Sequence, residues 1–371
     1  MKDLSKISVV LPSLDPDDKL VAVIDGLLEY GFTDIILVND GSNPENLHYF
    51  EDAAAQHPQI HLLHHPVNRG KGAALKTAFT WFLENRPDSI GVVTVDGDNQ
   101  HHPEDTRSCA EHMAEHDRLV LGVRDFSLPH VPPRSRTGNR ITSGVFKVFV
   151  GMTISDTQTG LRAIPTKDLK ILNTIAGDRF EYETNMLLAM KEYGIAFDEV
   201  KIRTVYIEEN KSSHFHAVRD SWRIYKLILA HFFRYGLSSI VSFVVDVGLV
   251  ALLTALCGDF LSGLALTAAA TIPARVISSL INFFMNKQLV FHSKVSTGNA
   301  MLRYYTLAIP VLIAQTLLTD GVYRLFSIGA DRMLLRSLIH VVVMVVLFTV
   351  TFVIQQRWVF ALKQTDKHKK D

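Results

Sequence analysis

The pattern of apolar and polar positions divides the chain at about residue 215. Before this point, short apolar runs alternate with amphipathic segments, and five runs are expected to be strands: residues 7–13, 34–40, 60–65, 90–96 and 118–124. Their nearly continuous apolarity is typical of strands that are buried on both faces of a parallel sheet. Residues 18–30 and 72–84 have the apolar spacing of helices. The alternation predicts a doubly wound α/β domain with a mostly parallel sheet over residues 1–215.

The end of this domain carries one more helix and one more strand. We expect the helix at residues 180–194, the strand at 197–207 and a polar loop at 208–221. Residues 219–236 then mix aromatic with basic side chains. We therefore assign residues 216–235 to an amphipathic helix in the headgroup region of a membrane, with an ordinary surface helix as the alternative.

From residue 236 onwards the sequence is almost continuously apolar. Four segments reach the ~20 apolar residues that cross a bilayer core. They lie at residues 236–257, 262–285, 304–326 and 335–357. We expect four transmembrane helices within a domain at 236–362 and a basic cytoplasmic tail at 363–371. Basic residues gather before the first span, after the second and after the fourth, which places the first domain and both termini in the cytoplasm. Three arginines in the second outer loop depart from this pattern, whereas the lack of an apolar leader agrees with it.

Composition removes several classes of protein. The only two cysteines, Cys109 and Cys257, lie in different halves of the chain, so a disulfide framework is not expected. The histidine clusters lack the partner residues of a zinc site. No GxGxxG sequence follows the first strand, which argues against a Rossmann dehydrogenase. The formal net charge is zero, and we expect no nucleic-acid partner.

Polar side chains gather where the predicted strands end. They are Ser13, Asp15, Asn39, Asp40, Asp96, Asp98 and Arg124. Ligands of doubly wound sheets bind beyond the carboxyl ends of the strands. Asp96 and Asp98 directly follow a buried strand, and carboxylate oxygens suit a hard cation such as Mg²⁺ or Mn²⁺. Asp pairs are also common at turns, so their position in the series of strands gives this pair its weight.

Six stretches together resemble glycosyltransferase family 2, in the order in which that family carries them: VVLPSLDPDDKL, IILVNDGS, NRGKGAAL, VTVDGDNQHHPED, GVR and SDTQTGLRAIP. The likeness is greatest to polyprenyl-phosphate glycosyltransferases of the dolichol-phosphate-mannose-synthase and GtrB type. The apolar half, with its ending NFF…NK…VF, is similar to the GtrA family. The resemblance implies a GT-A fold, a nucleotide-sugar donor, a divalent metal and a polyprenyl-phosphate acceptor.

The resemblance also implies roles for single residues on the donor side. The nucleotide would be bordered by Pro12, Ser13 and Asp15, its base contacted by Asp40, and its phosphates approached by Lys71. The metal would be held by Asp96, Asp98 and Gln100, with Asp96 also facing the donor. Asp156 matches a family aspartate near the donor and is our third catalytic candidate, with the capping of a turn as the alternative.

The acceptor phosphate calls for basic side chains. The candidates are Arg124, Arg134, Ser135, Arg136 and Arg203, with Arg140 nearby. Arginine forks match phosphate oxygens, although a basic patch facing anionic lipid is the alternative. A phosphate oxygen is already ionised at neutral pH, so no catalytic base is required. Glu181 and Glu183 are the acidic candidates if one exists.

The resemblance implies an inverting hexosyltransferase that supplies a cell-envelope glycan, with UDP-glucose as the first choice of donor. A synthase using GDP-mannose, and a lipid-linked sugar flippase with a donor-binding domain, are the alternatives. A processive polysaccharide synthase would carry QxxRW in its catalytic domain. In the sequence IQQRWV the position four residues before Trp358, where this motif requires glutamine, is Ile354. The segment also lies at the end of a membrane span, so it does not match the motif.

Two features stand out in the membrane half. Asp246 and Arg275 lie about 15–18 Å from the cytoplasmic ends of their spans, and we expect them to pair, with His340 and Asp320 as further candidates. The sequences NFFMNKQLVF and FVIQQRWVF end the second and fourth spans alike. Duplication of a helical hairpin, or merely two snorkelling basic ends, would explain this echo. Assembly into a homo-oligomer would enlarge so small a bundle.

Overall fold

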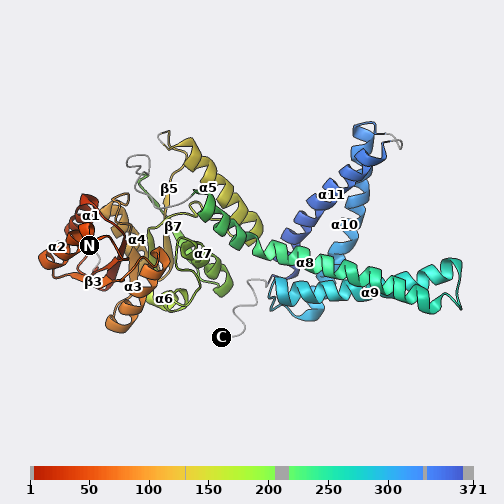
Figure 1. Cartoon of the computed structure of the whole chain (residues 1–371), viewed down its shortest axis with the longest axis horizontal. Helices are drawn as coiled ribbons and strands as arrows, with labels where there is room; N and C mark the ends of the chain where they lie inside the picture. Colours follow the sequence, from red (N-terminus) through yellow and green to blue (C-terminus); the bar gives the residue numbers. More distant parts are fainter. Residues whose placement is uncertain (1–3, 130, 205–216, 329–331, 362–371) are drawn as a thin grey trace. The chain divides into compact units, whose positions relative to one another are not determined.

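The computed structural model describes residues 4–129, 131–204, 217–328 and 332–361. The chain falls into two compact units, Met1–Ile228 and Leu229–Asp371. The predicted domain boundaries remain predictions. The two units are shown in Figure 1 and are described separately.

The first unit is built on a seven-stranded sheet. Its strands are β1 (Ile7–Ser13), β2 (Ile35–Asn39), β3 (Ile60–His64), β4 (Gly91–Thr94), β5 (Leu119–Arg124), β6 (Arg162–Pro165) and β7 (Phe197–Ile202). Their order in the sheet is β3-β2-β1-β4-β6-β5-β7. Only β6 runs antiparallel to its neighbours, β4 and β5. The mostly parallel sheet is confirmed, and β6 is the strand that the sequence pattern did not predict.

Helices cover both faces of this sheet (Figure 1). One face packs against α1 (Asp18–Glu29), α2 (Leu47–Gln56) and α4 (Pro103–His116). The other face packs against α3 (Lys71–Asn85), α6 (Thr166–Leu172) and α7 (Glu181–Tyr193). Successive strand residues therefore enter different cores: Val9 and Leu11 lie in the first, and Val10 lies in the second. Burial on both faces explains the unbroken apolar runs.

The carboxyl ends of β1, β2, β4 and β5 meet at one edge of the sheet. β1 is parallel to β2 and β4, and β5 runs in the same direction because β6 is antiparallel to both β4 and β5. A short 3₁₀ helix (Pro44–Asn46) follows β2, and α5 (Pro133–Val145) follows β5 and continues into a π-helical turn (Phe146–Val150). The loops after these strands form the site described below.

The second unit consists of long apolar helices, the first of which begins before Leu229, within the first unit. They are α8 (Ala217–Cys257), α9 (Gly263–Met285), α10 (Thr297–Leu325) and α11 (Met333–Ile354). Their membrane-spanning segments are Phe232–Cys257, Gly263–Val290, Thr297–Leu325 and Met333–Val359. The four predicted spans are confirmed, and the chain is a multi-pass membrane protein.

The start of α8 corrects one prediction. Residues 205–216, which hold most of the predicted loop, lie outside the described residues, but residues 217–221 are helical rather than part of a loop. The predicted helix at 219–236 forms the first part of α8, which runs without a break from Ala217 to Cys257, and its place in the headgroup region stays a prediction. No proline interrupts this stretch, so the helix simply continues from its amphipathic part into the span.

The two halves of the membrane unit repeat each other: the first hairpin consists of α8 and α9, and the second hairpin consists of α10 and α11. α9 and α11 each end in a five-residue π-helical turn, Asn286–Val290 and Gln355–Val359, and these turns lie 69 positions apart in the sequence. The same spacing relates Phe283 to Phe352, both of which are fully buried. A duplicated helical hairpin accounts for such a constant offset, whereas snorkelling basic ends would not impose it.

Contacts between the two hairpins follow the same symmetry. Asn286 donates to its own equivalent, Gln355, at 3.4 Å. The rings of Phe291 and its equivalent Phe360 stack with centroids 5.1 Å apart. Two further ring contacts are equivalent under the same offset. The ring centroids of Tyr235 and Phe352 are 5.3 Å apart, and those of their equivalents, Tyr304 and Phe283, are 5.4 Å apart. The hairpins are therefore related by an approximate twofold axis between Asn286 and Gln355, as in parallel repeats of membrane proteins.

The predicted intramembrane ion pair is present in the first hairpin. Arg275 Nη2 lies 3.2 Å from Asp246 Oδ2, and Ser278 Oγ donates to Asp246 Oδ1 at 2.9 Å. The two further candidates do not join this pair: His340 lies 3.5 Å from Gln315, and Asp320 pairs with Arg324. Both lie on the second hairpin, where their own neighbours on α10 and α11 satisfy them.

Replacing Asp246 with alanine should lower the thermal unfolding temperature of the full chain in detergent. Arg275 would lose the carboxylate that offsets its charge, and an unpaired arginine at the centre of a span costs about 2.5–3.5 kcal/mol. Asp246→Ala/Arg275→Met should recover most of the loss, and Asp259→Ala, an exposed position beyond the end of α8, serves as the control. Equal unfolding temperatures for Asp246→Ala and Asp259→Ala would contradict the stabilising role of the pair.

Candidate active site

The loops after β1 and β2 are tied together by Asp15. Its carboxylate accepts hydrogen bonds from Asn43 N at 2.7 Å and Asn43 Nδ2 at 3.0 Å, and its own N–H donates to Ser42 Oγ at 2.8 Å. Pro12 and Ser13 are the last residues of β1. A Cβ placed on Gly97 would lie 3.2 Å from Ser13 Oγ. The candidate nucleotide residues after β1 therefore lie beside the acidic loop after β4.

Asp40 faces inward, toward the loop before α3. Its carboxylate accepts from Arg69 N at 3.0 Å and Gly70 N at 2.8 Å, and His65 Nδ1 lies 2.7 Å away. Position 70 requires glycine, because its φ is +102° and a Cβ would lie 2.5 Å from Asp178 O. Asp40 thus fixes the backbone that leads into Lys71. Contact between Asp40 and a nucleotide base stays a prediction.

Lys71, the first residue of α3, lies between two carboxylates. Its Nζ is 2.7 Å from Asp96 Oδ1 and 2.9 Å from Glu183 Oε1. Burial alone would lower the pKa of Lys71, but the charges of Asp96 and Glu183 outweigh burial and raise it above its usual range. The ammonium group is therefore charged throughout the physiological pH range.

Asp96 and Asp98 are in opposite electrostatic situations. Burial favours the protonated form of Asp96, yet the charge of Lys71 and the hydrogen bond from His101 hold its pKa well below the usual range. His101 Nε2 lies 3.5 Å from Asp96 Oδ2. For Asp98, burial and the nearby charge of Asp96 raise the pKa. The charge of Lys71 opposes this rise in the pKa of Asp98 but does not outweigh it.

This pair has the donor chemistry of a magnesium or manganese site. Such ions are commonly held by one or two carboxylates, with substrate phosphates and water completing the shell. Among the described residues, no cluster of three or more His, Cys, Asp or Glu side chains could hold an ion without such help. Gln100 N donates to Asp98 Oδ1 at 3.1 Å, which keeps Gln100 beside the pair. The predicted ligands fit an ion that binds together with a phosphorylated substrate.

Arg124, at the end of β5, is held by Asp156. Arg124 Nε and Nη2 lie 2.7 and 3.1 Å from the two carboxylate oxygens of Asp156, whose side chain is fully buried. Asp156 also accepts from Gln158 N at 3.0 Å, as expected for a turn cap. This geometry makes Asp156 a support for Arg124. Its participation in catalysis remains a prediction.

The other predicted acceptor residues lie on α5 and after β7. Arg134 and Arg136 are exposed on the first turn of α5, Ser135 lies between them, and Arg136 Nη2 donates to Leu128 O at 2.9 Å. Arg203 differs, because its guanidinium pairs with Glu104. Arg124 is paired with a carboxylate as well, so ion pairing does not separate Arg203 from Arg124 as a candidate for binding phosphate.

The sequence did not predict where two residues of the site, Arg162 and Glu183, would lie. Arg162, in β6, is completely buried and donates to Thr159 O at 3.1 Å and to Glu183 O at 2.8 Å. Burial lowers the pKa of Arg162, and the charges of Glu183 and Asp156 oppose that effect. The sequence indicates Glu183 only as a candidate base. What could have indicated both residues is that each is a charged residue within an otherwise buried segment, and a buried charge needs a partner.

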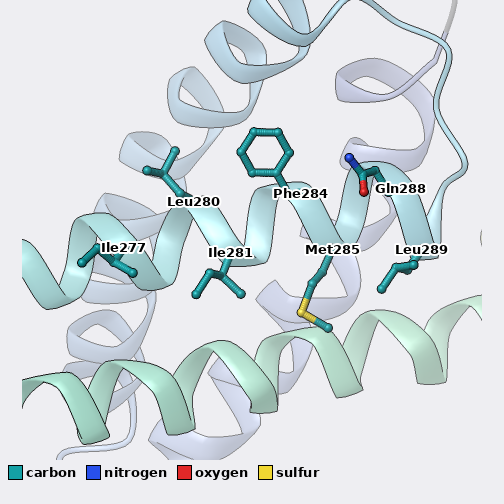
Figure 2. A pocket seen from close by; sticks show the side chains of 7 residues that line it. All are labelled: Ile277, Leu280, Ile281, Phe284, Met285, Gln288 and Leu289. Carbon is teal, nitrogen blue, oxygen red and sulfur yellow. The ribbon is translucent and has the colours of Figure 1, made fainter.

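A pocket in the second unit has a different character. Figure 2 shows its lining along α9 and the π-helical turn that follows, formed by Ile277, Leu280, Ile281, Phe284, Met285, Gln288 and Leu289. Gln288 is the only polar side chain among them, and none is titratable. Apolar walls of this kind suit a hydrocarbon chain, so the chemistry belongs to the acidic edge of the sheet in the first unit.

The first unit has the GT-A fold: a mostly parallel sheet with one antiparallel strand, and an acidic pair after β4. The model of glycosyl transferase family 2 matches residues 8–170, and the model of the GtrA/DPMS transmembrane domain matches residues 234–360. The chain therefore carries a glycosyl transferase family 2 domain followed by a GtrA/DPMS transmembrane domain. It is an enzyme, a glycosyltransferase.

Curated relatives agree with this assignment. An uncharacterized protein of Methanocaldococcus jannaschii is 28% identical over 62% of this chain and 93% of its own length. The UDP-N-acetylglucosamine–dolichyl-phosphate N-acetylglucosaminyltransferase of Methanococcus voltae is 24% identical over 54% of this chain and 86% of its own. The undecaprenyl-phosphate mannosyltransferase of Micrococcus luteus is 27% identical over 48% and 75%. Among solved structures, glucosyl-3-phosphoglycerate synthase of Mycobacterium tuberculosis gives a TM-score of 0.47 at 16% identity, covering 60% of this chain and 78% of its own.

Proposed function

We propose that this protein transfers a hexose from a nucleoside-diphosphate sugar to the phosphate of a polyprenyl lipid. The observation that carries the proposal is one sheet edge with two kinds of site. The acidic pair after β4 contacts Lys71 at the start of α3, and Arg124 at the end of β5 pairs with Asp156. The first set suits a diphosphate with its metal, and the second suits a phosphate monoester. Two of the relatives are named for polyprenyl-phosphate acceptors.

The reaction needs alignment more than proton transfer. An oxygen of the acceptor phosphate attacks the anomeric carbon, the bond from that carbon to the diphosphate oxygen breaks, and the nucleoside diphosphate leaves with the bonding electrons. Attack from the opposite side inverts the anomeric centre. No proton has to be removed from the ionised phosphate, so the main contributions are orientation and charge stabilisation.

Each part of the site has a task in this scheme. Lys71 places a fixed positive charge beside Asp96 on the donor side, and Arg124 offers its guanidinium to the acceptor. A Mg²⁺ or Mn²⁺ ion on Asp98 and Asp96, with Gln100 nearby, would supply positive charge to the leaving diphosphate when bound. Pro12, Ser13, Asp15 and Asp40 would border the nucleotide. Arg134, Ser135 and Arg136 are the further acceptor candidates on α5.

The proposal includes a donor and an orientation. We place the first unit and both termini on the cytoplasmic side, because basic residues flank the spans there. UDP-glucose is the proposed donor, and GDP-mannose is the main alternative, since a relative is named as a mannosyltransferase. The product would be a polyprenyl-phosphate-linked hexose that serves a later transferase of the cell envelope.

A screen of donors tests the proposal directly. Purified full-length protein in detergent would receive undecaprenyl phosphate, MgCl₂ and one radiolabelled donor at a time: UDP-glucose, UDP-galactose, UDP-N-acetylglucosamine or GDP-mannose. We expect UDP-glucose to label the organic phase, and undecaprenol without its phosphate to remain unlabelled. Label from GDP-mannose alone would replace the donor but keep the reaction. Failure of every donor to label the lipid would overturn the proposed transfer.

A further inference from the structure

Glu183 lies in the first turn of α7 and extends its carboxylate toward α3. Its side chain is 15% exposed and contacts the ammonium group of Lys71 at 2.9 Å. The backbone carbonyl of the same residue accepts a hydrogen bond from Arg162 at 2.8 Å. One residue therefore contacts two buried cations at the donor side of the site.

The backbones on either side of this contact are closely packed. A Cβ added to Gly72 would lie 2.5 Å from Tyr182 Cβ, and Ala73 N donates to Asp178 O at 2.9 Å. The start of α3 therefore cannot shift away from the start of α7 without breaking these contacts. What stays adjustable is the long side chain of Lys71, whose four methylene groups leave many rotamers open.

Two carboxylates restrict that side chain. Glu183 and Asp96 approach the Lys71 ammonium group from separate elements, α7 and the loop after β4. An ammonium group has three N–H donors, so two carboxylates leave one donor for a ligand. Without Glu183, the ammonium group would be held by Asp96 alone, and Asp96 is also a proposed metal ligand.

We propose that Glu183 is a positioning residue that holds the Lys71 ammonium group in place for the diphosphate of the donor. This inference rests on the proposed function, because it takes the ligand of Lys71 to be a nucleoside diphosphate. It differs from the role of a general base. A carboxylate paired with an ammonium group is a poor proton acceptor, and an ionised acceptor phosphate has no proton to give up.

A double-mutant cycle tests the link between the two residues. The affinity for UDP in the presence of MgCl₂ would be measured by calorimetry for the wild type, Glu183→Gln, Lys71→Met and the double variant. We expect Glu183→Gln to weaken binding about tenfold, the lower end of what a charged hydrogen bond contributes. In the Lys71→Met background the same change should have little further effect. Glu181→Gln, in the same helical turn, is the matched control.

Two results would overturn the positioning role. Unchanged UDP affinity together with a large fall in kcat would make Glu183 a base. If Glu183→Gln lowered the affinity for UDP equally in the wild type and in Lys71→Met, the effect of Glu183 would be independent of the lysine. GDP measured in parallel covers the alternative donor.

A second measurement needs no nucleotide. Full-length protein would be treated briefly with acetic anhydride at one fixed pH, and modification of Lys71 would be compared by mass spectrometry with that of Lys76 in the same helix. We expect the Lys71 to Lys76 ratio to rise several-fold in Glu183→Gln, because a lysine released from a carboxylate is more mobile and accessible. An unchanged ratio would refute the contact. If the wild type binds neither UDP nor GDP, the proposed donor class fails, while this ratio still decides the role of Glu183.

Discussion

Transfer activity should fall about a thousandfold when Asp98 is replaced by asparagine, which is the scale seen when one group that stabilises transition-state charge is removed. Asparagine keeps the shape of the side chain and one oxygen atom but removes the charge that a divalent ion needs. Because burial and Asp96 already raise the pKa of Asp98, the ionised side chain is disfavoured in the absence of a cation. The neutral replacement removes that repulsion. The fall in activity should therefore occur without any fall in unfolding temperature.

The measurement is an initial rate over a series of MnCl₂ concentrations, together with thermal unfolding of the same preparations. Asp117→Asn is the matched control, because Asp117 is exposed and its left-handed conformation, with φ of 48°, also suits asparagine. Wild-type rates in Asp98→Asn would disprove the involvement of this carboxylate in catalysis. A rate that falls only in proportion to the folded fraction would assign it a structural role.

Gly160→Ala should reduce activity about a hundredfold, since a displacement of roughly 1 Å at a reacting site can cost that much. A Cβ at this position would lie 2.3 Å from Asp96 Oδ2 and 3.0 Å from its Cγ. The carboxylate of Asp96 therefore packs so closely against Gly160 that no side chain fits at position 160 unless Asp96 moves. The carboxylate would have to rotate away from Lys71 and His101, and the donor side would lose its arrangement.

Gly144→Ala provides the control, because nothing lies within 4 Å of a Cβ at that position. Unlike several other glycines of the chain, Gly160 does not have a positive φ, so an alanine there is not strained by its own backbone. Kinetics and thermal unfolding would be measured together. If Gly160→Ala retained more than half of the wild-type kcat/KM, the packing of Gly160 against Asp96 would be irrelevant to function.

Much of the first unit could be predicted because its sheet is buried on both faces. Unbroken apolar runs located β1 to β5, and the rule that ligands bind beyond the carboxyl ends of strands brought Asp96, Asp98 and Arg124 to one edge. Lys71 was indicated only by the family resemblance. β6 escaped prediction for a physical reason. It has only four residues, and it contains the buried Arg162 together with Pro165, so no apolar run marks it.

The partners of the charged residues could not be predicted in the same way. The contacts of Lys71 with Glu183 and of Arg124 with Asp156 join residues far apart in the sequence, and neither local spacing nor periodicity encodes such pairs. The pairing of Asp246 with Arg275 was accessible, because charges at equal depth in adjacent spans must offset each other. The composition distinguishes an amphipathic segment from the span that follows it, but it does not encode whether the two form one continuous helix, as they do in α8.

The repeated hairpins have a consequence for how the membrane half tolerates change. A surface on which a residue meets its own equivalent across a twofold axis is isologous, so one hairpin contains everything needed to bind a copy of itself. Joining both copies in one polypeptide fixes their ratio and frees each to diverge. The positions of Asp246 and Arg275 are occupied in the later copy by the uncharged Gln315 and Met344. The interface has remained self-matching, whereas the ion pair between Asp246 and Arg275 belongs to one arm alone.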